Sequence, residues 1–191
     1  FIQQLKQLSL KQSYPSKEKI DTLLKYYKNG HIINAENLAL SLTQEFPRHA
    51  FGWKVLGVIL GDTGRKIEAL SALQTALEIA PQDTRTHNNL GNILKNLGRF
   101  EEAELSFKQS INLNPKSALA HNNLGTMLRE IERFDEAKSS FEQAIRLDPE
   151  LAVAYNNLAL TFVDLLRYDD AQANYTQAIK LNPNLSQAYY N

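Results

Sequence analysis

Five of the chain's six prolines recur at a spacing of 34 residues: Pro47, Pro81, Pro115, Pro149 and Pro183. Five alanines recur with the same spacing: Ala35, Ala69, Ala103, Ala137 and Ala171. One period kept without an insertion is typical of a repeat array, in which each repeat buries its apolar face by packing on its neighbours. The spacing divides the chain into five repeats and the start of a sixth, at 16–49, 50–83, 84–117, 118–151, 152–185 and 186–191.

The pattern inside a repeat predicts two helices. In the repeat 84–117, apolar and aromatic side chains three and four residues apart place one helix over about 86–97. Gly98 follows this helix, and glycine readily adopts the left-handed conformation that ends helices. Glu101 and Glu102 begin the second helix, where carboxylates interact favourably with the helix dipole. Pro115 ends it, because proline lacks the amide that would continue the hydrogen bonding. The predicted fold class is therefore all-α.

The repeat resembles the tetratricopeptide repeat (TPR), which carries an aromatic residue, Leu-Gly, alanines and a proline at set places. The matching residues of the second repeat are Trp53, Leu56, Gly57, Ala69, Ala76 and Pro81, and those of the fourth are Leu124, Gly125, Ala137, Phe141, Ala144 and Pro149. The resemblance covers residues 16–191. It implies a right-handed superhelical solenoid of antiparallel helix pairs, with the first helix of each pair lining the concave surface. The first repeat departs from the pattern at Leu23 and Ala39.

Small residues at one position of the first helices are expected to let the two helices of a repeat approach closely. They are Gly57, Gly91, Gly125 and Ala159. Aromatic residues of the second helices are expected to fill the space between a repeat and its neighbour. They are Phe107, Phe141 and Tyr175. Residues 1–15 are expected to form a short amphipathic helix that caps the array or ends a preceding segment.

Asparagines form a second periodic series on the first helices. Asn89, Asn123, Asn157 and Asn191 share one position of the repeat. The resemblance places this ladder in the concave groove, similar to the repeat region of O-linked N-acetylglucosamine transferases and related bacterial repeat proteins. A side-chain amide offers two donors and an acceptor, so a row of amides is suited to the backbone of an extended peptide. The alternative is that these asparagines bond to the neighbouring helix and hold the stack together.

The predicted peptide-binding groove contains thirteen residues in all. They are Lys54, Arg85, Asn88, Asn89, Asn92, Lys95, Asn122, Asn123, Thr126, Arg129, Asn156, Asn157 and Asn191. The cations by which some TPR modules clamp a C-terminal carboxylate are absent, because Leu119 and Asn123 occupy their positions. A clamp for chaperone tails is therefore not expected.

The composition argues against several other functions. The chain has 21 basic and 21 acidic residues, whereas nucleic-acid binders and polybasic membrane-surface modules carry a basic excess. It has no cysteine, and no catalytic, dinucleotide or metal-binding motif is present. His87 and His121 share the aromatic position of successive repeats, too far apart for one metal. We therefore predict no catalytic residues, no cofactor and no metal.

Two functional hypotheses follow. The first is a protein-interaction module that binds an extended peptide or protein segment in its groove. The second is the substrate-recruiting N-terminal region of a larger enzyme, because similar repeats often precede glycosyltransferase, sulfotransferase or methyltransferase domains. Weak self-association is a further expectation. Four apolar residues of the last complete second helix are expected to stay exposed at the C-terminal end: Tyr175, Ala178, Ile179 and Leu181.

Overall fold

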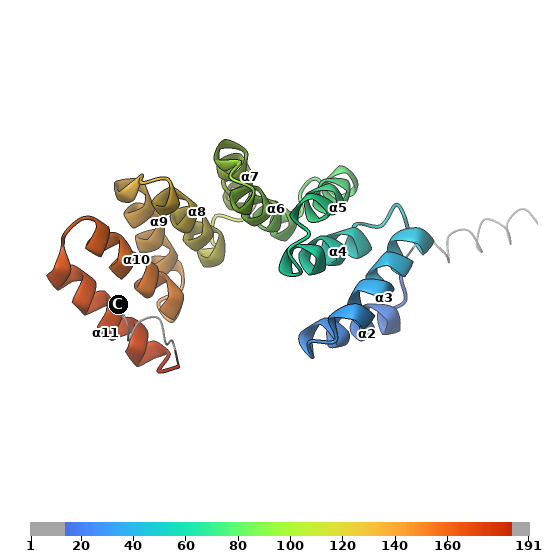
Figure 1. Cartoon of the computed structure of the whole chain (residues 1–191), viewed down its shortest axis with the longest axis horizontal. Helices are drawn as coiled ribbons and strands as arrows, with labels where there is room; N and C mark the ends of the chain where they lie inside the picture. The colour runs from blue at the N-terminus through green and yellow to red at the C-terminus, as the bar shows by residue number, and fades with distance from the viewer. Residues whose placement is uncertain (1–13, 185–191) are drawn as a thin grey trace, which may run out of the picture. The chain divides into compact units, whose positions relative to one another are not determined.

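The computed structural model describes residues 14–184, which form ten α-helices and no strand (Figure 1). The helices are α2 Lys17–Lys28, α3 Ile32–Glu45, α4 Ala50–Asp62, α5 Lys66–Ile79, α6 Thr84–Asn96, α7 Phe100–Leu113, α8 Ala118–Glu130, α9 Phe134–Leu147, α10 Ala152–Asp164 and α11 Tyr168–Leu181. The all-α fold class is therefore confirmed. The expected N-terminal helix over residues 1–15 and the start of a sixth repeat, Asn191 included, lie outside the described residues, apart from Tyr14 and Pro15.

The helices keep the period of the sequence. The first helices α4, α6, α8 and α10 begin at residues 50, 84, 118 and 152, and the second helices from α3 to α11 begin at 32, 66, 100, 134 and 168. Helix α6 begins two residues before the predicted start at 86. It does so because the Asp83 carboxylate caps it, accepting a 3.0 Å hydrogen bond from the Thr86 amide.

The chain forms two compact bodies, an N-terminal body that ends at Leu97 and a C-terminal body that begins at Gly98. The N-terminal body contains α2 to α6, and the C-terminal body contains α7 to α11. Within each body, successive helices pack against one another, as α4 packs on α5 and α8 on α9.

The small residues allow the predicted close approach of paired helices. A Cβ atom added to Gly57 would lie 2.6 Å from Leu73 Cγ, and one added to Gly125 would lie 2.8 Å from Phe141 Cε1. The Phe141 ring thus lies against the first helix of its own repeat. Its ring is fully buried, so burial of this side chain stabilises the helix pair by about 2–3 kcal/mol.

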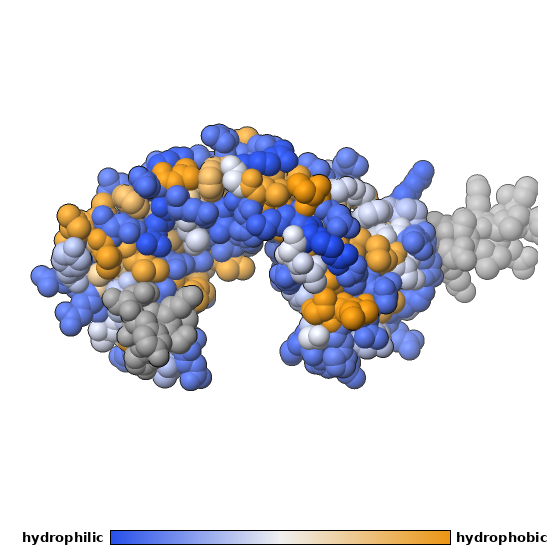
Figure 2. Space-filling view, in the orientation of Figure 1, coloured by the Kyte–Doolittle hydropathy of each residue, from blue (hydrophilic) through white to orange (hydrophobic). Residues whose placement is uncertain are grey.

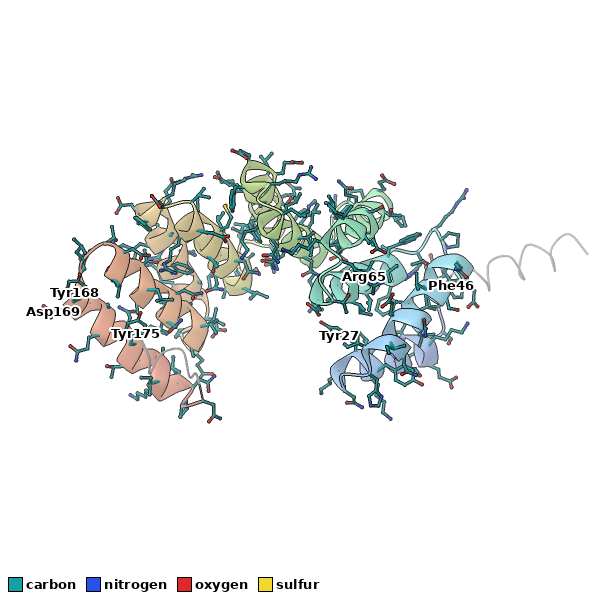
Figure 3. The ribbon with its side chains drawn as sticks, in the orientation of Figure 1. Tyr27, Phe46, Arg65, Tyr168, Asp169 and Tyr175 are labelled. Atoms are coloured by element: carbon teal, nitrogen blue, oxygen red, sulfur yellow. The ribbon has the colours of Figure 1, made fainter. Side chains whose placement is uncertain are left out.

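The apolar patch expected at the C-terminal end is not open. Tyr175 and Ala178 are buried, and Ile179 and Leu181 are half-buried. Tyr175 occupies the position of Phe141, whose ring is buried against the first helix of its own repeat. The large apolar side chains that are exposed at this end are Leu166 and Tyr168, in the turn from α10 to α11 (Figure 3 labels Tyr168).

The turns between paired helices share one backbone conformation. Gly30, Gly64 and Gly98 have φ angles of 75°, 82° and 73°, the left-handed conformation predicted for Gly98. The equivalent residues of the next two repeats are Glu132 and Leu166, with φ angles of 61° and 58°. The turn therefore keeps its geometry even where a side chain makes that geometry costly.

Hydrophilic residues cover most of the surface seen in Figure 2, with smaller hydrophobic patches between them in both bodies. No helix among residues 14–184 combines the length and the apolar character needed to cross a membrane.

Candidate functional site

The predicted groove residues fall into two groups by burial. Asn88, Asn122 and Asn156 are buried, with exposed fractions of 8%, 6% and 3%. These three therefore lie inside the stack, which corrects their placement on an open groove surface. Arg85 is exposed, and the others within the described residues are half-buried: Lys54, Asn89, Asn92, Lys95, Asn123, Thr126, Arg129 and Asn157.

In the C-terminal body, Asn157 of the asparagine ladder is hydrogen-bonded to the preceding first helix. The side-chain amide of Asn157 on α10 donates hydrogen bonds to Asn122 Oδ1 at 3.1 Å and to Thr126 Oγ1 at 3.4 Å, both on α8. One turn beyond Thr126 along α8, Arg129 Nε donates to Asp164 Oδ2 on α10 at 2.5 Å. Polar side chains of α8 and α10 thus bridge the two first helices along this face.

The buried acceptor Asn156 Oδ1 has no hydrogen-bond partner among the described residues. It occupies the position of Asn122 Oδ1, which accepts from Asn157. In the register of the repeat, the corresponding donor position is 191, outside the described residues.

In the N-terminal body, Lys54 turns away from the ladder. Its ammonium group donates to the Asp83 carboxylate at 2.7 Å. Burial alone would raise the pKa of Asp83, but the bonds from Lys54 and from the Thr86 amide outweigh it and lower the pKa. Lys54 therefore supports the start of α6 and is occupied in a structural ion pair.

A polar pocket of about 140 Å³ lies between α4 and α6. Its polar lining is Asp62 from the end of α4 and Asn89, Asn92 and Asn96 from α6. Its apolar lining includes Gly57, Val58, Gly61, Leu73 and Ile93. Among residues 14–184 the side-chain amides of these three asparagines have no hydrogen-bond partner, so their donors and acceptors are available to a ligand.

The pocket exists because α4 has no counterparts of the α8 side chains that bond to α10. Lys54 and Val58 stand where Asn122 and Thr126 stand, and Asn89 therefore has no counterpart of the bonds made by Asn157. Gly61 stands where Arg129 stands, so α4 offers no side chain to Asn96, the equivalent of Asp164. The Lys66 ammonium group of α5 instead donates to the backbone carbonyl of Asn96 at 2.8 Å.

Asp62 is the charged group of the pocket. Tyr27 on α2 donates its hydroxyl to Asp62 Oδ2 at 2.5 Å (Figure 3 labels Tyr27). Burial, the hydrogen bond to Asp62 and the charge of its carboxylate raise the pKa of Tyr27 to about 12. A carboxylate has about four acceptor positions, so Asp62 keeps acceptor capacity beyond the Tyr27 bond.

A larger pocket of about 440 Å³ lies among α7, α8 and α9. Ile111, His121 and Gln143 are among its lining residues. Burial lowers the pKa of His121, which favours the neutral form of its ring. None of the predicted groove residues lines this pocket, which offers an alternative location for a ligand.

Asp62 was missed by the sequence analysis, although Asp62, Asn96, Glu130 and Asp164 recur at the spacing of the repeat. Among residues 14–184 there is no group of three or more histidine or acidic side chains that could hold a metal ion.

Helix pairs that repeat every 34 residues and pack in sequence define the class of helical repeat proteins, which present extended surfaces to their ligands. The family comparison is more specific. A model described as "Tetratricopeptide repeat" matches residues 83–150 and 116–184, and another with the same description matches 53–83. These matches cover more than half of the chain, which therefore belongs to the tetratricopeptide repeat family. Such repeats typically serve protein–protein interaction.

Solved structures share this fold at low sequence identity. The chain matches a crystal structure of MamA with a TM-score of 0.73 and 18% identity, over 91% of this chain and 99% of MamA. It matches YrrB, "a TPR protein with an unusual peptide-binding site", with a TM-score of 0.68 and 19% identity, over 92% and 91% of the two chains. It matches PilF of Pseudomonas aeruginosa with a TM-score of 0.80 and 21% identity, over 90% and 78%. No curated protein matches the sequence.

Proposed function

We propose that this chain is a protein-interaction module that binds an extended peptide or protein segment along its first helices. The observation that carries the proposal is the pocket between α4 and α6, where the side-chain amides of Asn89, Asn92 and Asn96 have no hydrogen-bond partner among residues 14–184. We infer the kind of ligand, a peptide or protein segment, from family membership and from the structural neighbour YrrB, which is described as having a peptide-binding site.

The chemistry of the pocket suits a peptide backbone. Each amide side chain offers both donors and an acceptor, matching the alternating N–H and C=O groups of an extended chain. The amides are half-buried or at the edge of the pocket, so a bound backbone would displace water without leaving the asparagines unpaired. In the C-terminal body, Asn157 is already bonded to α8.

A peptide array tests the proposal. Purified protein is incubated with immobilised extended peptides, and capture is compared between the parent and the variant Asn89→Ala/Asn92→Ala. We expect weaker capture by the variant, because each lost hydrogen bond costs about 0.5–1.5 kcal/mol of binding free energy.

The matched control is Asn34→Ala/Asn37→Ala, which removes two exposed asparagines of α3 in the same body. It should capture peptides as well as the parent does. Equal capture by the groove variant and the control, with helicity intact in both, would rule out this surface as the binding site.

A further inference from the structure

Resting on the proposed function, we infer that the pocket between α4 and α6 is a specificity site for an arginine side chain of the bound segment. The proposal starts from a periodic interaction. In the contacts α2–α4 and α8–α10, a long side chain near the end of one first helix reaches an acidic residue at the end of the next. Tyr27 donates to Asp62 and Arg129 donates to Asp164, each pair 35 residues apart.

The contact between α4 and α6 lacks this reaching side chain. Its residue at the same position is Gly61, and the facing residue is Asn96. A Cβ atom added to Gly61 would lie 2.6 Å from Ile93 Cδ1, so Ile93 has moved into part of the space that a side chain would take. What is left is the 140 Å³ pocket, bounded by the exposed Asp62 and by amides of α6.

The charge of the pocket defines its ligand. Asp62 contributes a carboxylate, and Asn89, Asn92 and Asn96 contribute side-chain carbonyl oxygens that no described residue uses. No basic residue lines the pocket. Lys54 on α4 is held by Asp83, and Lys66 on α5 donates to the backbone carbonyl of Asn96. The site therefore presents one negative charge surrounded by acceptors, and its complement is a cation with several donors.

A guanidinium group fits this arrangement better than an ammonium group. It is planar, carries five N–H donors and can contact a carboxylate while also donating to flanking carbonyls. Its aliphatic stem would lie over Val58, which is half-buried and forms apolar lining of the same pocket. The partner's arginine would thus occupy the place that Arg129 holds within the C-terminal body.

The test uses the small probe N-acetyl-arginine methylamide and its neutral isostere N-acetyl-citrulline methylamide. Both are titrated into isotopically labelled protein, and the resonances of the Gly61 backbone amide and the side-chain amides of Asn92 and Asn96 are followed. The arginine probe is expected to shift these resonances saturably, and the citrulline probe is expected not to. Equal shifts with both probes, or no shift at the highest soluble probe concentration, would overturn the proposal.

Two variants change the affinity in opposite directions. Asp62→Asn should weaken arginine binding about tenfold or more, because a charge-assisted interaction is lost. The control Glu78→Gln removes one exposed carboxylate of α5 in the same body and should leave binding unchanged. Tyr27→Phe removes the hydroxyl that competes for Asp62 and should tighten binding about two- to tenfold. Arginine binding that is insensitive to both Asp62→Asn and Tyr27→Phe would contradict the assignment.

The peptide array separates this proposal from the proposed function. Capture of extended peptides without any preference for arginine over citrulline would refute the arginine site and leave the interaction module standing. No capture of any peptide would refute the proposed function, and the probe titration would still decide whether the pocket binds arginine.

Discussion

The side-chain amide of Asn157 donates a 3.1 Å hydrogen bond to Asn122 Oδ1, which lies 35 residues earlier on the preceding first helix. Asn122 is buried, so this bond satisfies an acceptor that water does not reach. Asn89 occupies the position of Asn157 in the N-terminal body, but the position of Asn122 is taken there by Lys54, which is bonded to Asp83. One repeated residue type thus has two different environments.

The two asparagines are expected to respond differently to removal of the amide. Asn157→Ala should lower the free energy of unfolding by about 1–3 kcal/mol, because Asn122 Oδ1 stays buried without its donor. Asn89→Ala should change it by less than about 0.5 kcal/mol, because no described residue bonds to this side chain. Urea denaturation followed by circular dichroism measures both. Equal losses would mean that both amides are structural.

Glycine is expected to stabilise the protein at the two turn positions where a residue with a side chain has a left-handed conformation. Leu166→Gly and Glu132→Gly should each raise the free energy of unfolding by about 1 kcal/mol, because glycine adopts φ angles near 60° without the steric penalty of a side chain. Leu166 is 72% exposed, so little packing is lost with it. The control Leu165→Gly changes the adjacent residue, whose φ angle is −86°, and should destabilise the protein. Thermal melts in which Leu166→Gly behaves like Leu165→Gly would refute the strain argument.

The Lys54–Asp83 pair predicts a pH dependence. The folded state lowers the pKa of Asp83, so the unfolded chain binds the proton more tightly. The stabilisation by this carboxylate is then fully present above its ordinary pKa of 3.8 and is lost as the pH falls through the lowered folded value. Asp83→Asn keeps a capping side chain but removes the charge, and should cost about 0.2–1 kcal/mol at pH 7.

Denaturation of the parent and of Asp83→Asn across a pH series measures this difference. It should shrink toward zero at acidic pH, below the folded pKa of Asp83. A difference in stability that is the same at pH 7 and at strongly acidic pH would show that Asp83 acts only as a helix cap.

Weak self-association is still expected at the C-terminal end, now through different residues. Leu166 and Tyr168 are 72% and 62% exposed in the same turn, and neighbouring exposed apolar side chains favour association. Light scattering over a concentration series should show a rising average mass for the parent, and Tyr168→Glu should abolish the rise. The control Ile33→Glu alters an equally exposed side chain of α3 and should leave the rise in place. A constant monomer mass at all concentrations would contradict this expectation.

The fold was predictable from the sequence because the residues that determine it recur at a fixed spacing. Prolines, small residues and glycines recur every 34 residues, and the helix starts recur with them. Consecutive helical residues point about 100° apart, so of each Asn-Asn pair only one can face the surface. Both members of each pair were predicted to lie in the groove, whereas Asn88, Asn122 and Asn156 are buried.

The pocket was not predictable because it results from missing interactions. Its position depends on Gly61 having no side chain, on Val58 being unable to bond to Asn89, and on Lys54 binding Asp83 instead. Each of these residues is unremarkable when it is read alone. Their joint effect appears only when the helices α4 and α6 are placed side by side.

The most direct test of the account locates a bound peptide on the surface of the protein. The peptide captured most strongly on the array is titrated into labelled protein, and the side-chain amide resonances of Asn89, Asn92 and Asn96 are compared with those of Asn112 and Gln143, which line the larger pocket among α7, α8 and α9. The account predicts saturable shifts for the three asparagines of α6, with Asn112 and Gln143 unchanged. Shifts confined to Asn112, Gln143 and their neighbours would contradict it, because the ligand would then bind at the other pocket.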